Sequence, residues 1–328
     1  MSSPDVVLGP NQYGKAEVRV VRVNRETPVH QLMDLNVSSM LRGDFADCYA
    51  TGDNARVIAT DTQKNTVYAF AKEHGIATPE EFLLLLGRHF TDQEEVSGGR
   101  WTAESYPWER IQVPGSDGEP QAHEHSFVKS KQEVRTAALT IQDGKEHLLG
   151  GFSDLTVLKT TGSEFSGFPR DRYTTLPETQ DRIMATDITA RWLFSADAGT
   201  PQGAGSSQDP ATLDPAPLDP ATLDFDAIYA AVKQQVLEQF ALVHSLSLQQ
   251  TLYAAGEAVL AAVPEIEDIR FVMPNNHHYV VDLSPFGLEN PNEVFQAGDR
   301  PYGLMNASVT RRAAPARPHA WEWLGGFC

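Results

Sequence analysis

The sequence predicts an α+β protein in which two modules of the same design follow one another. Two observations indicate this class. Segments with strand-type patterning flank a pair of helical segments, and this order of two strands, two helices and two strands occurs twice along the 328 residues. Such an order is typical of antiparallel sheets covered on one face by helices. We therefore expect a first module over 1–147 and a second over 148–328.

The first module begins with a β-like run in which Val18, Val20 and Val23 are interspersed with arginines. The following helices are indicated by apolar residues at helical spacing and by acidic residues before the second helix, which complement the helix dipole. Strand-type runs then return. The segments predicted for this module are strands over 18–23 and 29–41, helices over 65–72 and 82–90, and strands over 101–108 and 127–141.

The second module repeats this order, and its first helix has the clearest signal. Apolar residues recur there at steps of four, four, four and three residues, a helical period. They are Ile228, Val232, Val236, Phe240 and Val243. The predicted segments are strands over 155–158 and 188–194, helices over 225–243 and 248–263, and strands over 269–273, 279–283 and 305–310.

A segment rich in Pro, Ala and Asp interrupts the second module at about 197–224. It contains the near-repeat Asp-Pro-Ala-Thr-Leu at 209–213 and 219–223. Its prolines restrict the backbone, and few of its side chains are apolar enough to be buried. We expect a solvated surface insertion that acts as a spacer and carries no chemistry.

Composition excludes several classes of function. With 26 Lys and Arg against 44 Asp and Glu, the net charge is −18. This balance argues against a nucleic-acid partner and an acidic membrane surface, which both attract cationic side chains. No apolar run is long enough for a membrane span, and the first residues do not form a secretory signal. The two cysteines, Cys48 and Cys328, cannot form a disulfide framework. We expect a cytoplasmic protein.

Three clusters of residues could carry chemistry. His123, His125 and the pair His277-His278 could ligate a metal, although a solvated loop is the better interpretation for His123, and neighbours on a strand face opposite sides. The polar run 274–279 could form a binding edge or a turn.

The third cluster is aromatic and basic, and it could bind a planar anion or form surface ion pairs with neighbouring aspartates. Its members are Phe165, Phe168, Arg170, Arg172 and Arg182. The sequence contains no phosphate-binding Gly-rich loop and no serine nucleophile elbow.

Taken together, separated motifs between about Tyr13 and Val309 resemble the urate oxidase (uricase) family. The matching residues are Tyr13-Gly14-Lys15, Val57 to Thr62, Lys64-Asn65-Thr66, His123, His125-Ser126-Phe127, Leu155 to Lys159, Gly167-Phe168, Arg170-Asp171, Tyr173 to Leu176, Glu178-Thr179, Asp181-Arg182, Pro274-Asn275, His277 and Asp282-Leu283.

The resemblance implies the tunnelling fold (T-fold), in which two modules per chain assemble into a tunnel-shaped homotetramer. It implies oxidation of urate by molecular oxygen and water to 5-hydroxyisourate and hydrogen peroxide, without a metal or other cofactor. The carboxyl end has no Ser-Lys-Leu signal, which supports a cytoplasmic enzyme.

The family's functional residues map onto this sequence as follows. Lys15, Thr60 and His277 would form a proton relay, because a threonine hydroxyl alone is too weak an acid or base. Arg182 and Gln249 would pair with opposite edges of urate, and Phe165 would stack on its face. Asn275 and Thr60 would hold oxygen or water, and the backbone of Asp61 and Leu248 would contact the purine. Each site would lie between two subunits, with Thr60 and Asp61 from one chain and Arg182, Gln249 and Asn275 from its neighbour.

Three positions depart from the family pattern. Ser166 and Asn276 stand where relatives often have Trp and Lys, and Gln250 beside Gln249 leaves open which amide meets urate. Two alternatives to urate oxidation remain. One is a zinc-dependent pterin or purine enzyme of the same fold that uses His123, His125 and His277, and the other is a non-catalytic purine-binding protein.

Overall fold

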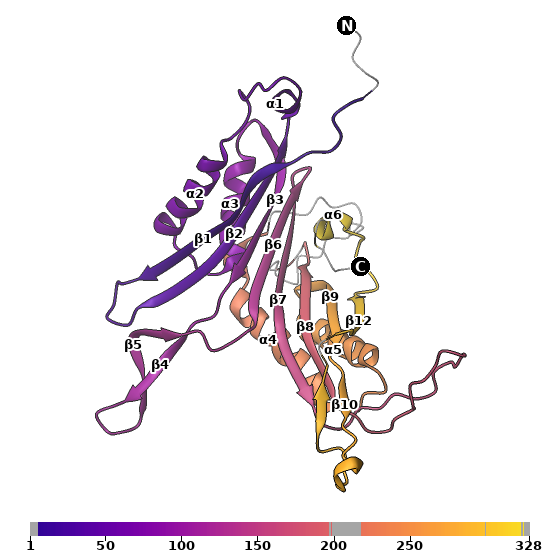
Figure 1. Ribbon diagram of the computed structural model, residues 1–328. Helices are drawn as coiled ribbons and strands as arrows, with labels where there is room; N and C mark the ends of the chain where they lie inside the picture. Colours follow the sequence, from indigo (N-terminus) through magenta and orange to yellow (C-terminus); the bar gives the residue numbers. More distant parts are fainter. Residues whose placement is uncertain (1–5, 197, 199–217, 299, 323, 325–328) are drawn as a thin grey trace. The chain divides into compact units, whose positions relative to one another are not determined.

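The computed structural model describes residues 6–196, 198, 218–298, 300–322 and 324, and its elements follow the order expected from the sequence (Figure 1). The chain forms two compact units. One comprises Met1–Gly150, Ala196–Phe225 and Arg317–Glu322, and the other comprises Gly151–Ser195, Asp226–Ala316 and Trp323–Cys328. The mixed helical and antiparallel architecture confirms the α+β class, while the module boundary after residue 147 stays a prediction.

The first unit is a sheet with the order β1-β2-β3-β6 and antiparallel neighbours. Helix α2 packs on β1, and α3 packs on β3 and β6. Strands β4 and β5 form a separate antiparallel pair. The elements are β1 (Tyr13–Asn24), β2 (Gln31–Gly43), α1 (Ala46–Ala50), α2 (Thr60–Glu73), α3 (Pro79–Thr91), β3 (Val96–Ser105), β4 (Glu109–Pro114), β5 (Pro120–Val128), β6 (Val134–Gln142) and α6 (Pro318–Trp321).

Local sequence explains these elements. Val18 and Val20 on β1 are buried while the residues between and beside them face solvent, as strand alternation requires. Helix α3 begins at a good cap: the Thr78 hydroxyl accepts a hydrogen bond from the amide of Glu81 at 3.2 Å. Its apolar face packs on the sheet, where Trp101 is fully buried.

The second unit repeats the arrangement. Strand β7 (Lys145–Lys159) begins in the first unit and continues into the second, where the order is β7-β8-β9-β12 and α5 packs on β9 and β12. All four apolar residues of the first expected helix up to Phe240 are buried, whereas Val243 lies beyond its end. The elements are β8 (Met184–Phe194), α4 (Phe225–Leu242), α5 (Leu248–Ala262), β9 (Ile266–Asn275), β10 (His278–Val280), β11 (Phe295–Ala297) and β12 (Gly303–Thr310). Within the described residues, no helix is long and apolar enough to cross a membrane.

Two expectations about the strands of the first unit need correction. The strand expected over 127–141 is divided into β5 and β6, because the charged and polar run 129–133 interrupts the apolar pattern. His123, expected in a solvated loop, lies on β5 and is partly buried.

The Pro/Ala/Asp-rich insertion lies mostly outside the described residues, and its described carboxyl end is not solvated as expected. Leu218 is only 5% exposed and Leu223 only 6%. Arg88 donates a hydrogen bond to the Leu218 carbonyl, and the Leu218 amide donates to Glu146 at 3.2 Å. This end of the insertion is therefore part of the packed first unit.

Candidate functional site

The expected site residues fall into two groups, one in each unit. Lys15, Thr60 and Asp61 belong to the first unit. The second unit contains the remaining six: Phe165, Arg182, Leu248, Gln249, Asn275 and His277. Each group has its own supporting contacts.

Lys15 lies on the edge strand β1, opposite Ser39 of β2 and just before a shift in the register of the two strands. The preceding Gly14 is in unusually close contact with β2. A Cβ atom at Gly14 would lie 1.7 Å from the Ser39 carbonyl oxygen, so no other residue fits there without moving the strand. The path of β1 at Lys15 is thereby fixed.

Thr60 and Asp61 form the first turn of α2. No side chain caps this helix start. The first amide N–H groups of a helix have no partner within it, and they carry the positive end of the helix dipole. Thr60 is exposed, and its hydroxyl makes no hydrogen bond with a described residue. The turn can therefore receive an anion or a polar ligand.

Hydrogen bonds hold this helix start on β1, the strand that carries Lys15, and on the neighbouring β2. The Tyr13 hydroxyl donates to the Ile58 carbonyl at 3.1 Å. The buried amide of Gln63 donates to the same carbonyl and accepts a hydrogen bond from the Ser39 hydroxyl at 2.7 Å. Lys15 is opposite Ser39, so these contacts place the first turn of α2 beside Lys15.

The charge of Asp61 is already compensated within its own helix. Lys64 and Asn65 donate hydrogen bonds to its carboxylate and lower its pKa, and the charge of Lys15 adds to this lowering. Asp61 is therefore ionised at neutral pH, and its carboxylate is engaged by Lys64 and Asn65 and does not face a ligand as a free group. Its backbone amide remains available at the helix start.

Arg182 is the main cation of the second unit's group. Its guanidinium carbon lies 5.2 Å from the centre of the Phe165 ring, and its Nε donates to the Ser163 hydroxyl at 3.3 Å. Burial lowers its pKa, and no carboxylate of the described residues forms an ion pair with it. A partly buried cation without a counter-ion among the described residues favours an anionic ligand.

The Phe165 ring is fixed in place by backbone hydrogen bonds and by a stacked aromatic ring. Its backbone forms two hydrogen bonds with Thr179, at 2.8 and 3.0 Å. The Phe168 ring stacks on it with centroids 5.0 Å apart and an interplanar angle of 14°. Arg170, also named from the sequence, lies over the Phe168 ring and is exposed. A rigid aromatic ring beside an uncompensated guanidinium suits a planar anion.

Asn275 is the last residue of strand β9 in the same unit, and His277 follows it two residues later, just before β10. Asn275 is opposite both Thr186 and Gly303, and it is only 8% exposed. Its side-chain amide makes no hydrogen bond with a described residue. Burial lowers the pKa of His277, and the charge of Arg182 adds to this effect. The imidazole is therefore neutral at pH 7, so that one ring nitrogen donates and the other accepts.

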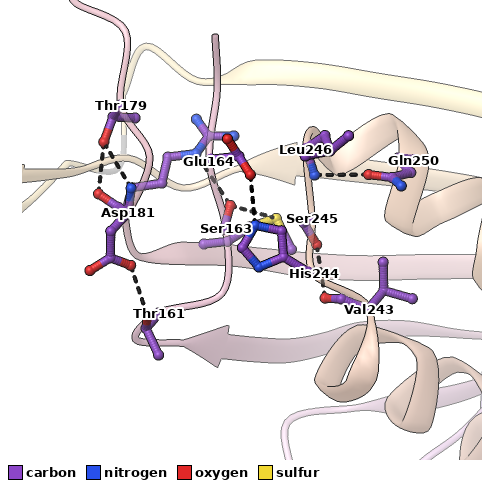
Figure 2. Close-up of polar contacts among 12 residues, drawn as sticks. Thr161, Ser163, Glu164, Thr179, Asp181, Val243, His244, Ser245, Leu246 and Gln250 are labelled. Atoms are coloured by element: carbon purple, nitrogen blue, oxygen red, sulfur yellow. Dashed lines mark hydrogen bonds and ion pairs between the residues drawn. The ribbon is translucent and has the colours of Figure 1, made fainter.

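The structure distinguishes the two neighbouring glutamines at the start of α5. The side-chain oxygen of Gln250 accepts a hydrogen bond from the Leu246 amide at 2.8 Å, as Figure 2 shows, so it is used to close the turn. Gln249 is exposed, and its amide has no partner among the described residues. Leu248, the first residue of the helix, is buried. Of the two, only Gln249 has both its amide oxygen and its NH₂ group without a partner among the described residues.

The histidines considered as metal ligands do not form such a site. The His123 and His125 rings lie 4.5 Å apart, and His30, which the sequence did not single out, lies 5.8 Å from His125. Among the residues that the structure describes, no three His, Cys, Asp or Glu side chains are placed to hold a metal ion.

The residues that support the second group were missed by the sequence analysis. They are the buried Ser163 and Ser245 and the partly buried Lys159, which lie next to Arg182 and the start of α5. Lys159 ends a motif that matched the family, but nothing in its pattern indicated a buried contact.

The second unit's group has the features that suit a planar anion, an aromatic ring beside a guanidinium, and the first unit's group places a lysine near an open helix start. Comparisons with known proteins identify the family. The uricase family model matches residues 11–140 and 149–306. A uricase from Arthrobacter globiformis is 51% identical over 324 residues, which cover 98% of this chain and 96% of the relative. A uricase from Aspergillus flavus is 34% identical, with 93% and 97% covered.

Solved structures agree with these relatives. The crystal structure of the uricase from Arthrobacter globiformis aligns with a TM-score of 0.83, covering 96% of this chain and 98% of that one at 51% identity. A uricase from Bacillus fastidious, at 23% identity and a TM-score of 0.72, shares the fold. The chain belongs to the uricase family, and it is a urate oxidase, an oxidoreductase.

Proposed function

We propose that the protein oxidises urate with molecular oxygen and water to 5-hydroxyisourate and hydrogen peroxide. Urate, O₂ and H₂O supply all the atoms of the two products. Urate loses two electrons and O₂ gains them. The reaction needs no bound cofactor, because doubly deprotonated urate is electron-rich enough to reduce oxygen itself. The observation that carries this proposal, beyond family membership, is the partly buried Arg182 guanidinium beside Phe165, which has no counter-ion in the part of the chain that the structure describes.

Recognition of urate follows from the free polar groups. The planar fork of Arg182 pairs with a carbonyl oxygen and a ring nitrogen, and the amide of Gln249 pairs with the opposite edge. Phe165 stacks on one face. The backbone amides of Asp61 and Leu248, each at the start of a helix, donate to the purine.

Proton transfer is assigned to Lys15, Thr60 and His277. Lys15 takes a proton from urate through the Thr60 hydroxyl, which donates to one partner while accepting from the other. His277 orders the water that attacks the oxidised ring, and its lowered pKa keeps it neutral for this role. Asn275 and Thr60 hold oxygen or that water above the ring, where the free Asn275 amide supports the assignment.

The active form is proposed to be a homotetramer with sites at subunit interfaces. One chain supplies Lys15, Thr60 and Asp61, and its neighbour supplies Arg182, Gln249 and Asn275. Neither group alone contains both a guanidinium for the purine and the lysine of the relay. Because the two groups are proposed to meet only across an interface between chains, separated chains should be inactive.

The test is urate consumption and peroxide release by the purified protein in the presence of a strong chelator. We expect turnover to persist. Lys15→Met and Thr60→Ala should lower kcat by about 100-fold or more with a smaller change in KM, because they remove proton transfer. Arg182→Gln should raise KM by about 10-fold or more, because a hydrogen bond to a charged group is lost.

Loss of turnover on chelation and its recovery with zinc would refute the cofactor-free proposal. Wild-type turnover in Lys15→Met would remove the relay, even if urate oxidation itself stands.

A further inference from the structure

A buried bridge joins the two segments of the second unit that carry the purine-recognition residues. Ser163 and Ser245 are both 0% exposed, and their backbones pair as a parallel bridge. The Glu164 amide donates to the Ser245 carbonyl at 2.8 Å, and the Ser245 amide donates to the Gly162 carbonyl at 2.9 Å. The first segment continues to Phe165, and the second, the turn between α4 and α5, continues to Gln249.

Ser163 holds Arg182 at two points. Its carbonyl accepts from the Arg182 backbone amide at 2.9 Å, and its hydroxyl accepts from Nε at 3.3 Å. The same hydroxyl contacts the Met184 sulfur at 3.7 Å. With Nε fixed, the terminal nitrogens of the guanidinium are directed by the plane of the group. An arginine oriented before its ligand arrives loses less side-chain entropy on binding.

Lys159 holds the other side of the bridge. Its ammonium donates to the Val243 carbonyl at 2.7 Å and to the Ser245 hydroxyl at 2.8 Å. The Ser245 hydroxyl also bonds to the Thr251 hydroxyl within α5. The turn is thus attached both to the end of β7 and to the helix that begins with Leu248.

An outer contact spans the same two segments. The Glu164 carboxylate lies 2.7 Å from Nε2 of His244, as Figure 2 shows together with Ser163 and Ser245. His244 is 59% exposed, so this pair is screened by solvent and contributes little. The buried bridge is the contact that sets the geometry.

We propose that Ser163 is a positioning residue for urate recognition: it orients the Arg182 guanidinium, and its bridge to Ser245 fixes the separation between Arg182 and Gln249. This inference rests on the proposed function, in which Arg182 and Gln249 form hydrogen bonds with opposite edges of the urate ring system. A fixed separation matches a ligand of fixed width. Ser163 itself does not touch urate.

The test is Ser163→Ala, with Thr161→Ala as the matched control. Thr161 lies on the same segment, and its hydroxyl donates to Asp181 at 2.8 Å instead of contacting Arg182. We expect Ser163→Ala to raise KM for urate, and the Kd for urate measured without oxygen, by about 3- to 10-fold, the effect of one lost hydrogen bond. The kcat should stay within twofold, and the control should change neither constant.

A double-mutant cycle separates positioning from general stability. In the Arg182→Gln background, Ser163→Ala should have no further effect on Kd, because there is no guanidinium to orient. Ser163→Cys keeps the shape of the side chain with a somewhat larger atom and replaces its hydroxyl with a weaker acceptor. It should raise the Kd less than alanine does, and it serves in place of the alanine variant if that does not fold.

Three results would overturn the inference. They are an unchanged Kd in both Ser163 variants, an equal increase with and without Arg182, and a fall in kcat at constant KM. If wild-type protein does not oxidise urate, the proposed function fails. If it does and Ser163 variants bind normally, only the positioning role fails.

Discussion

Protonation of one buried histidine should make the protein's stability fall in mildly acidic solution. His147 lies on β7 within the first unit and is only 7% exposed. Burial lowers its pKa from 6.5 to about 4, and the nearby charges of Arg317, His319 and Lys145 act in the same direction. The folded protein therefore keeps this imidazole neutral under conditions in which the unfolded chain protonates it.

Proton linkage gives the direction and the size of this change in the free energy of unfolding. Between the two pKa values the unfolded state binds more protons, so the stabilisation is complete above pH 6.5 and is lost as the pH falls toward 4. Between pH 7.5 and pH 5 the two pKa values give a loss of about 2 kcal/mol.

The assay is denaturant unfolding of wild type and His147→Gln at both pH values, at one protein concentration. The neutral glutamine cannot take up the proton, so the variant should lose about 2 kcal/mol less than wild type on acidification. Because each protein is compared between the two pH values, any change in stability caused by the substitution itself cancels. Equal losses in the two proteins would refute the reasoning, because another group would then control the acid sensitivity.

Three further predictions concern single positions. Gln249→Ala should raise the KM for urate, whereas Gln250→Ala should mainly lower stability by about 1 kcal/mol, the effect of a lost hydrogen bond at a helix start; a larger KM effect at Gln250 would reverse the assignment. Gly14→Ala should displace β1 and abolish most activity, since its Cβ would clash with the β2 backbone; wild-type turnover would show that the strand adapts easily. Leu218→Ala should lower the free energy of unfolding by about 2–3 kcal/mol, whereas deletion of 199–217 should leave activity largely intact; equal thermal stability of Leu218→Ala and wild type would refute the buried anchor.

The sequence predicted the fold well where periodicity was strong. The apolar steps from Ile228 to Phe240 gave a helix that the structure confirms within one residue of its predicted carboxyl end. It did not predict the short pair β4 and β5 in full, because short strands have too few residues for a clear period. The burial of Leu218 was also not predicted, because an apolar residue among prolines and aspartates has the sequence pattern of a loop.

Sequence motifs identified the candidate site residues, whereas the contacts that support those residues are visible only in the structure. Arg182 and Phe165 stood out from the sequence because charged and aromatic residues cluster there. Whether a described carboxylate pairs with Arg182, and whether the Leu246 amide uses Gln250, depends on contacts between residues whose spacing shows no pattern. Buried serines such as Ser163 have no sequence signature at all, because serine is common in turns and on surfaces.

The most direct test of the account asks whether one catalytic site forms from two chains. Lys15→Met and Arg182→Gln, each nearly inactive at low urate, are co-expressed with different tags, and oligomers that contain both are purified. A shared site restores urate oxidation to about a quarter of the wild-type rate, since random assembly pairs the two intact groups in about one site in four. Activity no higher than that of the separate variants would contradict a site built from Lys15 of one chain and Arg182 of another.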